Sequence, residues 1–110
     1  MQHSLFSASE KGYAAAKAAA DHADRKTTEW TKMASALFAT FARQAKGPFL
    51  TEEAREYAES HGLSEPPDGR AWGHIAKSAQ RAGITVSAGF GSAKSSNGSP
   101  KVLWIKKENT

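Results

Sequence analysis

The sequence predicts a mainly α-helical protein with a small β-hairpin at its end, which places the chain in the α+β class. Apolar residues recur at helical spacing in the middle of the chain. Two runs rich in β-branched residues lie near its end, and a Gly- and Ser-rich stretch separates them. At 110 residues, of which 39% are hydrophobic, the chain is long enough for one small domain with a thin core.

Residues 1–26 are predicted to form an Ala-rich helical extension, residues 27–107 the main domain and residues 108–110 a tail. The segment Ser9–Arg25 has high helix propensity but few large apolar groups, so we expect it to pack loosely or to serve a partner. The chain has no cysteine, no signal-peptide pattern and no apolar run near the ~20 residues of a membrane span. We therefore expect a cytoplasmic protein that does not enter a membrane.

The middle of the chain carries the strongest helical periodicity. Thr27 or Thr28 is expected to cap a helix that ends before Gly47 and Pro48. Its apolar residues recur at i, i+3, i+7 and i+11, and are predicted to face the core: Trp30, Met33, Leu37 and Phe41.

The second half of the chain predicts an ordered series of short elements. After the extended pair Phe49–Leu50, Thr51 is expected to cap a helix, and Asp68 to cap a further helix over residues 69–82. Strands are predicted at 84–88 and 101–106, with a loop over 89–100 between them. This order is that of a winged helix-turn-helix, in which the final hairpin is the wing. Phe49–Leu50 is expected to pair with the hairpin as a third strand.

Charge is segregated along the second half of the chain. From Gly69 to Lys107 there are seven Lys or Arg residues and no Asp or Glu. From Thr51 to Asp68 there are six acidic residues and one Arg. With a net charge of +4 and a pI near 9.5, this distribution indicates an anionic partner.

The helix predicted over 69–82 has two distinct faces. One consists of apolar residues at helical spacing and is expected to be buried: Trp72, Ile75, Ala79 and Ala82. The other is turned away from it and consists of basic residues and histidine: Arg70, His74, Lys77 and Arg81. Gly73 and Ser78 are small residues on or beside this second face. Such a face fits the major groove of a duplex, although any surface helix turns polar residues outward.

The loop 89–100 adds groups that commonly contact phosphate oxygens. Lys94, Ser96 and Asn97 lie within it, and Lys101 stands at its exit. The alternative reading is an ordinary solvated loop.

Four segments resemble a group of small proteins encoded by bacteriophages and prophages. They are PFLTEEAREYA from Pro48, PPDGRAWG from Pro66, RAGI from Arg81 and PKVLW from Pro100. The resemblance covers residues 19–104, and RAWG is its most distinctive part. It implies a winged-helix module with a DNA-associated role near phage regulatory or replication genes, in a bacterial host cell. The connector from His61 to Asp68 departs from a plain helix-turn-helix, being longer than the usual 3–4-residue turn.

Other chemistry finds little support in the sequence. Asp21, His22 and Asp24 do not converge within one helix, so no metal site is expected. The stretch from Gly89 to Lys94 lacks the Gly-Lys-Ser/Thr ending of a phosphate loop. No catalytic constellation is apparent, and we expect neither enzyme activity nor a cofactor.

The leading hypothesis is therefore a binding module for duplex DNA. The predicted contacts are Arg70, His74, Lys77, Ser78 and Arg81 on the helix, and Lys94, Ser96, Asn97 and Lys101 on the wing. The alternative is a winged-helix adaptor, or an inhibitor of a host protein, that binds another protein or a second copy of the chain through its N-terminal helices.

Overall fold

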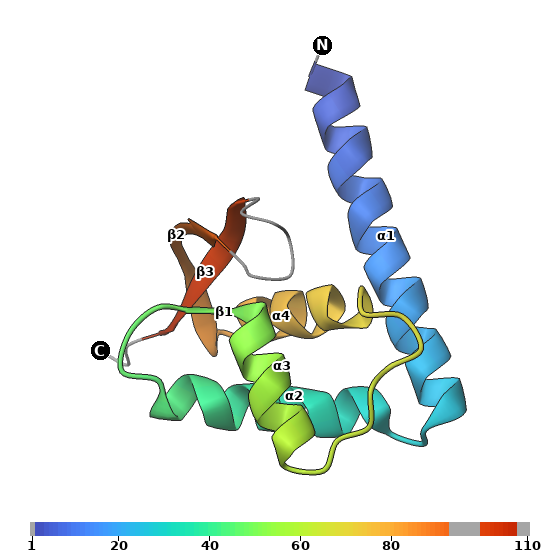
Figure 1. The fold of residues 1–110 in the computed structure, drawn as a ribbon. Helices are drawn as coiled ribbons and strands as arrows, with labels where there is room; N and C mark the ends of the chain where they lie inside the picture. Colours follow the sequence, from blue (N-terminus) through green and yellow to red (C-terminus); the bar gives the residue numbers. More distant parts are fainter. Residues whose placement is uncertain (1, 93–99, 108–110) are drawn as a thin grey trace.

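The computed structural model describes residues 2–92 and 100–107, with side chains from residue 12 onward within those ranges. In these ranges the chain forms four helices and a small three-stranded sheet, which confirms the predicted α+β class. The elements follow one another as α1 (Gln2–Lys26), α2 (Trp30–Gln44), β1 (Phe49–Leu50), α3 (Thr51–Ser60), α4 (Ala71–Arg81), β2 (Thr85–Ser92) and β3 (Pro100–Lys106) (Figure 1).

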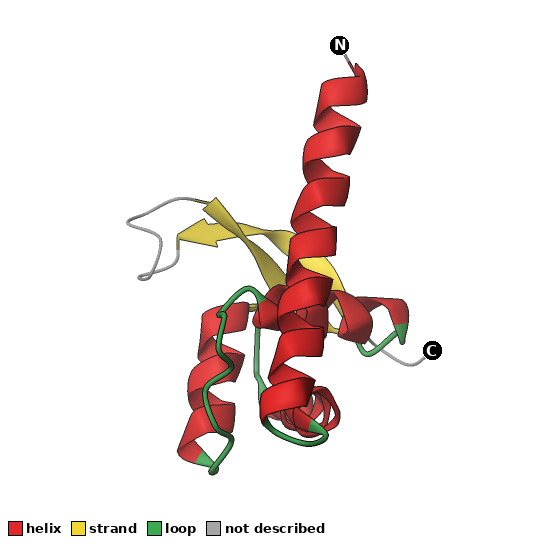
Figure 2. Ribbon diagram, turned by 90° about the vertical axis from the view of Figure 1, so that its right-hand side faces the viewer, coloured by secondary structure: helices red, strands yellow, loops and turns green. Residues whose placement is uncertain are grey.

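The sheet is antiparallel with the strand order β1-β3-β2. Phe49 lies opposite Trp104 and Leu50 opposite Leu103, so the expected third strand is confirmed. The hairpin strands are longer than predicted. Residues 89–92, expected in the loop, belong to β2, and residues 90–92 pair with residues 102–100 of β3 beyond a register shift. Figure 2 shows the hairpin projecting from the helical body.

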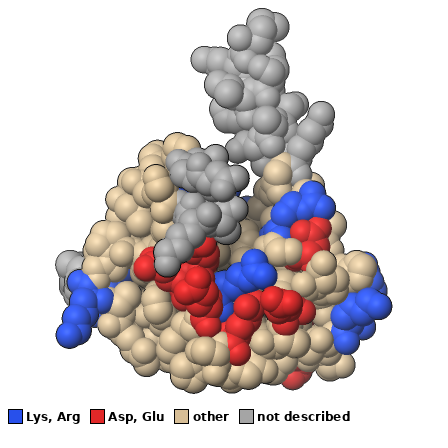
Figure 3. Space-filling view, in the orientation of Figure 1, with Lys and Arg blue, Asp and Glu red and all other residues tan. Residues whose placement is uncertain are grey.

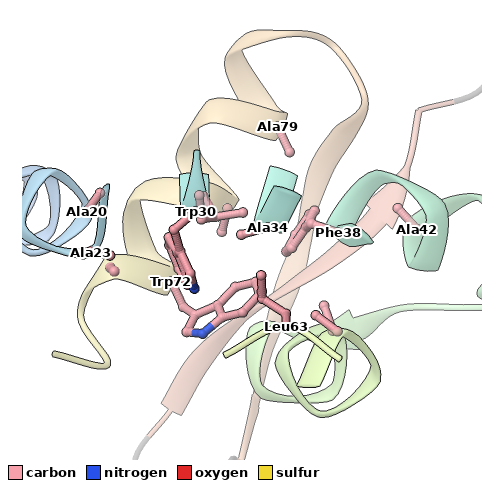
Figure 4. Close-up of a cluster of buried hydrophobic side chains, with 14 of the residues drawn as sticks. Ala20, Ala23, Trp30, Ala34, Phe38, Ala42, Leu63, Trp72 and Ala79 are labelled. Carbon is pink, nitrogen blue, oxygen red and sulfur yellow. The ribbon is translucent and has the colours of Figure 1, made fainter. Parts of the chain in front are cut away.

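The core lies where α2 and α4 meet, under the sheet. Trp30, Phe38 and Ile75 are almost completely buried. The rings of Trp30 and Trp72 pack edge to face, with centroids 5.3 Å apart, near the centre of the cluster in Figure 4. Trp30 Nε1 also donates a hydrogen bond of 2.9 Å to the carbonyl oxygen of Ser64, which ties the α3–α4 connector to the core.

The buried face of α2 differs from the predicted stripe. Trp30 is buried as expected, but Met33 is 41% exposed, and Leu37 and Phe41 are only partly buried. The residues that reach the core lie four apart instead: Trp30, Ala34, Phe38 and Ala42. Two of these are alanines, which allow the neighbouring elements to approach α2 closely. The sequence pattern followed Met33, Leu37 and Phe41, so the predicted face lies one residue before the buried residues Ala34, Phe38 and Ala42.

The Ala-rich α1 does not pack loosely. Ala16, Ala19, Ala20 and Ala23 are buried against the rest of the molecule. Small side chains allow α1 and α4 to approach closely, and a Cβ built on Gly73 of α4 would stand 3.5 Å from the Ala16 Cβ. The end of α1 also caps α2, because the Asp24 carboxylate accepts hydrogen bonds from the backbone N–H and the hydroxyl of Thr31.

Candidate nucleic-acid interface

Helix α4 is the element on which the predicted site depends. Its apolar face is buried as expected at Trp72, Ile75 and Ala79. Ala82 is exposed instead, because the helix ends at Arg81 and the chain turns away at Gly83, whose φ of 76° is left-handed. The helix starts at Ala71, later than predicted. Asp68 is not the N-cap residue, because it lies two residues before Arg70, which holds that position; its carboxylate accepts a 2.9 Å hydrogen bond from the Arg70 backbone N–H.

The outward face of α4 is not uniformly accessible. Arg70, Lys77 and Arg81 are exposed, and so is Gly73 between them. His74 and Ser78, which were expected to share this face, are partly buried. Helix α1 packs on this face, since its Tyr13 ring lies beside His74 and a Cβ built on Gly73 would stand 3.5 Å from the Ala16 Cβ. The tertiary structure therefore narrows the predicted contact face to a strip of three exposed basic residues, Arg70, Lys77 and Arg81, with Gly73 beside α1.

Helix α1 supplies the side chain that covers this side of α4. The Tyr13 ring lies 6.2 Å from the His74 ring, measured between centroids. Arg81 Nη1 donates a 2.7 Å hydrogen bond to Tyr13 Oη, and the guanidinium carbon stands 4.6 Å from the centre of the same ring. Tyr13 thus contacts two of the predicted DNA-binding residues.

The environment of His74 disfavours its charged form. Burial lowers the pKa of His74, and the nearby positive charges of Lys17 and Arg81 lower it further, while Asp21 and Asp24 oppose them. Its Nδ1 is buried and has no hydrogen-bond partner among the described residues. His74 is therefore better suited to packing against α1 than to carrying a positive charge toward a ligand.

Arg70 is exposed but already engaged. Its guanidinium donates hydrogen bonds to both carboxylate oxygens of Asp68, the shortest being 2.7 Å from Nη2. Hydrogen bonding to Arg70 lowers the pKa of the Asp68 carboxyl, and the same pair raises the pKa of Arg70. An anion that binds Arg70 must compete with this carboxylate.

Lys77 occupies the centre of the basic strip and borders two hollows. The first, which we name the α3 hollow, has a volume of about 360 Å³ and is lined by Thr51, Arg55, Trp72, Lys77, Lys101 and Trp104 among others. The second, which we name the hairpin hollow, has a volume of about 240 Å³ and is lined by Lys77, Gln80, Ser87, Phe90, Val102 and Trp104 among others. Lys77 and Lys101 thus come together although they are far apart in sequence. Lys101 is exposed on β3, whereas Lys94, Ser96 and Asn97 lie outside the described residues.

Acidic side chains are concentrated elsewhere. Figure 3 shows them gathered over α3, on the face that Figure 1 turns to the viewer. Residues 69–107 contain no acidic residue, so α4 and the hairpin contribute only positive charge to the surface. The charge segregation of the sequence is only partly kept in space, because Asp68 pairs with Arg70 and Glu52 lines the α3 hollow with Lys77 and Lys101.

The described residues form neither a metal-binding cluster nor a membrane-spanning helix. Within residues 2–92 and 100–107, no three His, Asp or Glu side chains are grouped so that they could hold a metal ion. None of the helices in the same ranges is long and apolar enough to cross a membrane.

Comparison with known proteins gives no match: the chain fits no family model, no curated protein and no solved structure.

Sequence reasoning missed two residues that shape this surface. Tyr13 was expected to serve an N-terminal helix apart from the site, and only the packing of α1 on α4 reveals its contacts. Phe90 was expected in a polar loop, yet it lies in β2 and is 72% exposed. The one sequence signal for Phe90 is a large aromatic residue placed between two glycines.

Proposed function

We propose that this protein binds duplex DNA as a winged helix-turn-helix module, with α4 as the recognition helix and the β2–β3 hairpin as the wing. The proposal is supported chiefly by the exposed strip Arg70, Gly73, Lys77 and Arg81. The three basic residues of this strip carry only positive charge, and Gly73 between them faces Ala16 of α1. A helix with such a face suits the major groove, where Lys and Arg reach guanine edges and phosphates.

The hairpin supports the same reading through its position beside the strip. Lys101 lines the α3 hollow together with Lys77 and Arg55, against one acidic residue, Glu52, so this hollow offers a path for a phosphate backbone. His74 and Ser78 leave the set of direct contacts in this proposal, because both are partly buried and Tyr13 of α1 lies beside His74. The resemblance to phage proteins adds a regulatory or replication-associated role to the proposal.

The test is fluorescence anisotropy on a random-sequence duplex across a salt series. A Lys77→Ala/Arg81→Ala/Lys101→Ala variant is compared with the wild type and with a Lys32→Ala/Arg43→Ala/Lys46→Ala control. The control removes the same net charge from exposed positions on or just after α2. Circular dichroism and thermal melting check that both variants fold.

We expect wild-type affinity to fall steeply with salt, and the log–log slope to lose about 0.9 for each phosphate contact removed in the first variant. The control should keep the wild-type slope to within about 0.9, the contribution of one phosphate contact. Equal losses in both variants would mean that only net charge matters. In that case, or without any binding at low salt, the proposed groove contact is wrong.

A protein adaptor is the second candidate function. It is favoured by the exposed side of α1, where Ala14 and Ala18, one turn apart, are small residues. Such a surface allows close packing against a helix of another protein or of a second copy. An adaptor of this kind should bind its partner with little dependence on salt, which distinguishes it from a duplex reader.

A further inference from the structure

Phe90 is the most exposed large hydrophobic side chain of the described residues. It is 72% exposed, whereas the next two, Met33 and Val86, are 41% and 40% exposed. A phenylalanine left in water on an ordered strand forgoes the burial that such side chains normally achieve on folding. Its surroundings show what kind of group would cover it.

An irregularity in the sheet aims the Phe90 side chain. Ser87 pairs with Trp104 and Phe90 with Val102, so two residues of β2 stand against one residue of β3 between these pairs. Gly89 lies in this irregular stretch with a φ of 96°, a conformation that favours glycine. In a strand without this irregularity, Phe90, which is three residues after Ser87, would lie on the opposite face from Ser87. With it, Phe90 shares the face of Val102 and the buried Trp104, which is the face turned to the helices.

Although it lies on this face, Phe90 remains largely exposed. The hairpin hollow, about 240 Å³ in volume, lies where Phe90, Lys77 and Gln80 come together. One wall of this hollow is therefore an aromatic ring, and another carries the ammonium group at the centre of the basic strip. A ligand that joins a planar ring to an anionic group could stack on Phe90 and pair with Lys77.

We propose that Phe90 is a base-stacking residue that receives an unpaired or unstacked base of a nucleic acid. This inference rests on the proposed function and specifies its substrate, a duplex interrupted by unpaired bases. The base stacks on the Phe90 ring, and its phosphate lies near Lys77, which lines the same hollow. Every base has a π-face, so the contact recognises the unpaired state and not a particular sequence. The absence of acidic residues from 69–107 matches a polyanionic chain and disfavours a protein surface of mixed charge.

The test compares an intact duplex with the same duplex carrying a central unpaired stretch, at one salt concentration. Phe90→Ala removes the ring, and Phe90→Trp keeps an aromatic ring. Val86→Ala is the matched control, because Val86 is an exposed apolar residue of the same strand on the opposite face. Melting curves check that each variant folds.

We expect the wild type to prefer the interrupted duplex, and Phe90→Ala to lose about tenfold in affinity for it and almost nothing for the intact one. Phe90→Trp should retain the preference. The native tryptophans are only 0%, 2% and 4% exposed, so the fluorescence that acrylamide quenches in this variant reports on position 90. That fluorescence should become protected when the interrupted duplex binds.

Three outcomes would overturn the inference. If Phe90→Ala binds both duplexes as the wild type does, while the triple variant of Lys77, Arg81 and Lys101 loses binding, the base contact is wrong and the proposed function stands. If Phe90→Ala changes only the self-association seen by sedimentation, a second copy covers the ring. If the wild type binds neither duplex, both proposals fail together.

Discussion

Arg81 on α4 and Tyr13 on α1 are held together by a 2.7 Å hydrogen bond from the guanidinium to the phenol oxygen. The guanidinium carbon also lies 4.6 Å from the centre of the Tyr13 ring. The two residues are 68 positions apart, so this contact exists only because α1 packs along α4. Helix α1 therefore fixes the direction of a basic side chain on the surface where we propose that DNA binds.

Tyr13→Ala is expected to weaken duplex binding by roughly 2- to 10-fold, because Arg81 would have to be ordered on binding. The stability should fall by about 1 kcal/mol, since an exposed cation–π contact and a hydrogen bond are lost. Titrations of Tyr13→Ala, Arg81→Ala and the double variant form the thermodynamic cycle that measures the coupling. Additive losses in binding free energy would show that Tyr13 does not act through Arg81.

Asp24→Ala is expected to destabilise the protein by about 1 kcal/mol, because the Thr31 backbone N–H at the start of α2 loses its acceptor. Asp21→Ala is the matched control. Asp21 lies one turn earlier on α1 and pairs with Lys17 on the surface, an interaction worth little. Urea denaturation measures both variants. An equal effect of the two substitutions would contradict the capping role of Asp24.

Thr51→Val is expected to cost about 1–3 kcal/mol. Trp104 is 4% exposed and its Nε1 donates a 3.1 Å hydrogen bond to Thr51 Oγ1, so the substitution leaves a nearly buried donor unpaired. Each kcal/mol corresponds to roughly 4 °C in Tm for a chain of this size. Thr51→Ser retains the hydroxyl and should melt within about 2 °C of the wild type. If Thr51→Val melts like Thr51→Ser, the hydrogen bond does not stabilise the fold.

His74 is expected to make the protein less stable as the pH falls below about 6.5, the ordinary pKa of histidine in an unfolded chain. Its pKa is lowered in the folded protein, first by burial and then by Lys17 and Arg81, against the opposing charges of Asp21 and Asp24. Between the folded pKa of His74 and about pH 6.5, the unfolded chain binds more protons than the folded protein. The contribution of His74 to stability is therefore full above about pH 6.5 and is lost as the pH falls toward the folded pKa.

The pH effect is measured as the urea midpoint of the wild type and of His74→Gln across a pH series. The difference between the two curves isolates His74 from the other titrating groups. The variant should show a shallower decline below about pH 6.5. Parallel curves would show that His74 does not contribute.

The sequence predicted helices and strands well where the spacing of residues within one segment is sufficient to identify the element. The buried face of α4 follows from the spacing of Trp72, Ile75 and Ala79, and the pairing of Phe49–Leu50 with the hairpin was also expected. In α2 the same reasoning centred the apolar face on Met33 and Leu37 and left Ala34 and Phe38 at its flank, whereas these two are the buried residues. Periodicity within one helix cannot tell which of two adjacent faces its neighbours will cover.

The sequence by itself determined the α+β class, the apolar face of α4 and the separation of acidic from basic segments. These are properties of neighbouring residues, set by helix and strand periodicity and by composition. Only the tertiary structure decided that α1 covers His74, that Arg70 is paired with Asp68, and that Phe90 faces the helices. The contact of Tyr13 with Arg81 and the register of β2 on β3 join residues distant along the chain, and packing alone brings such residues together.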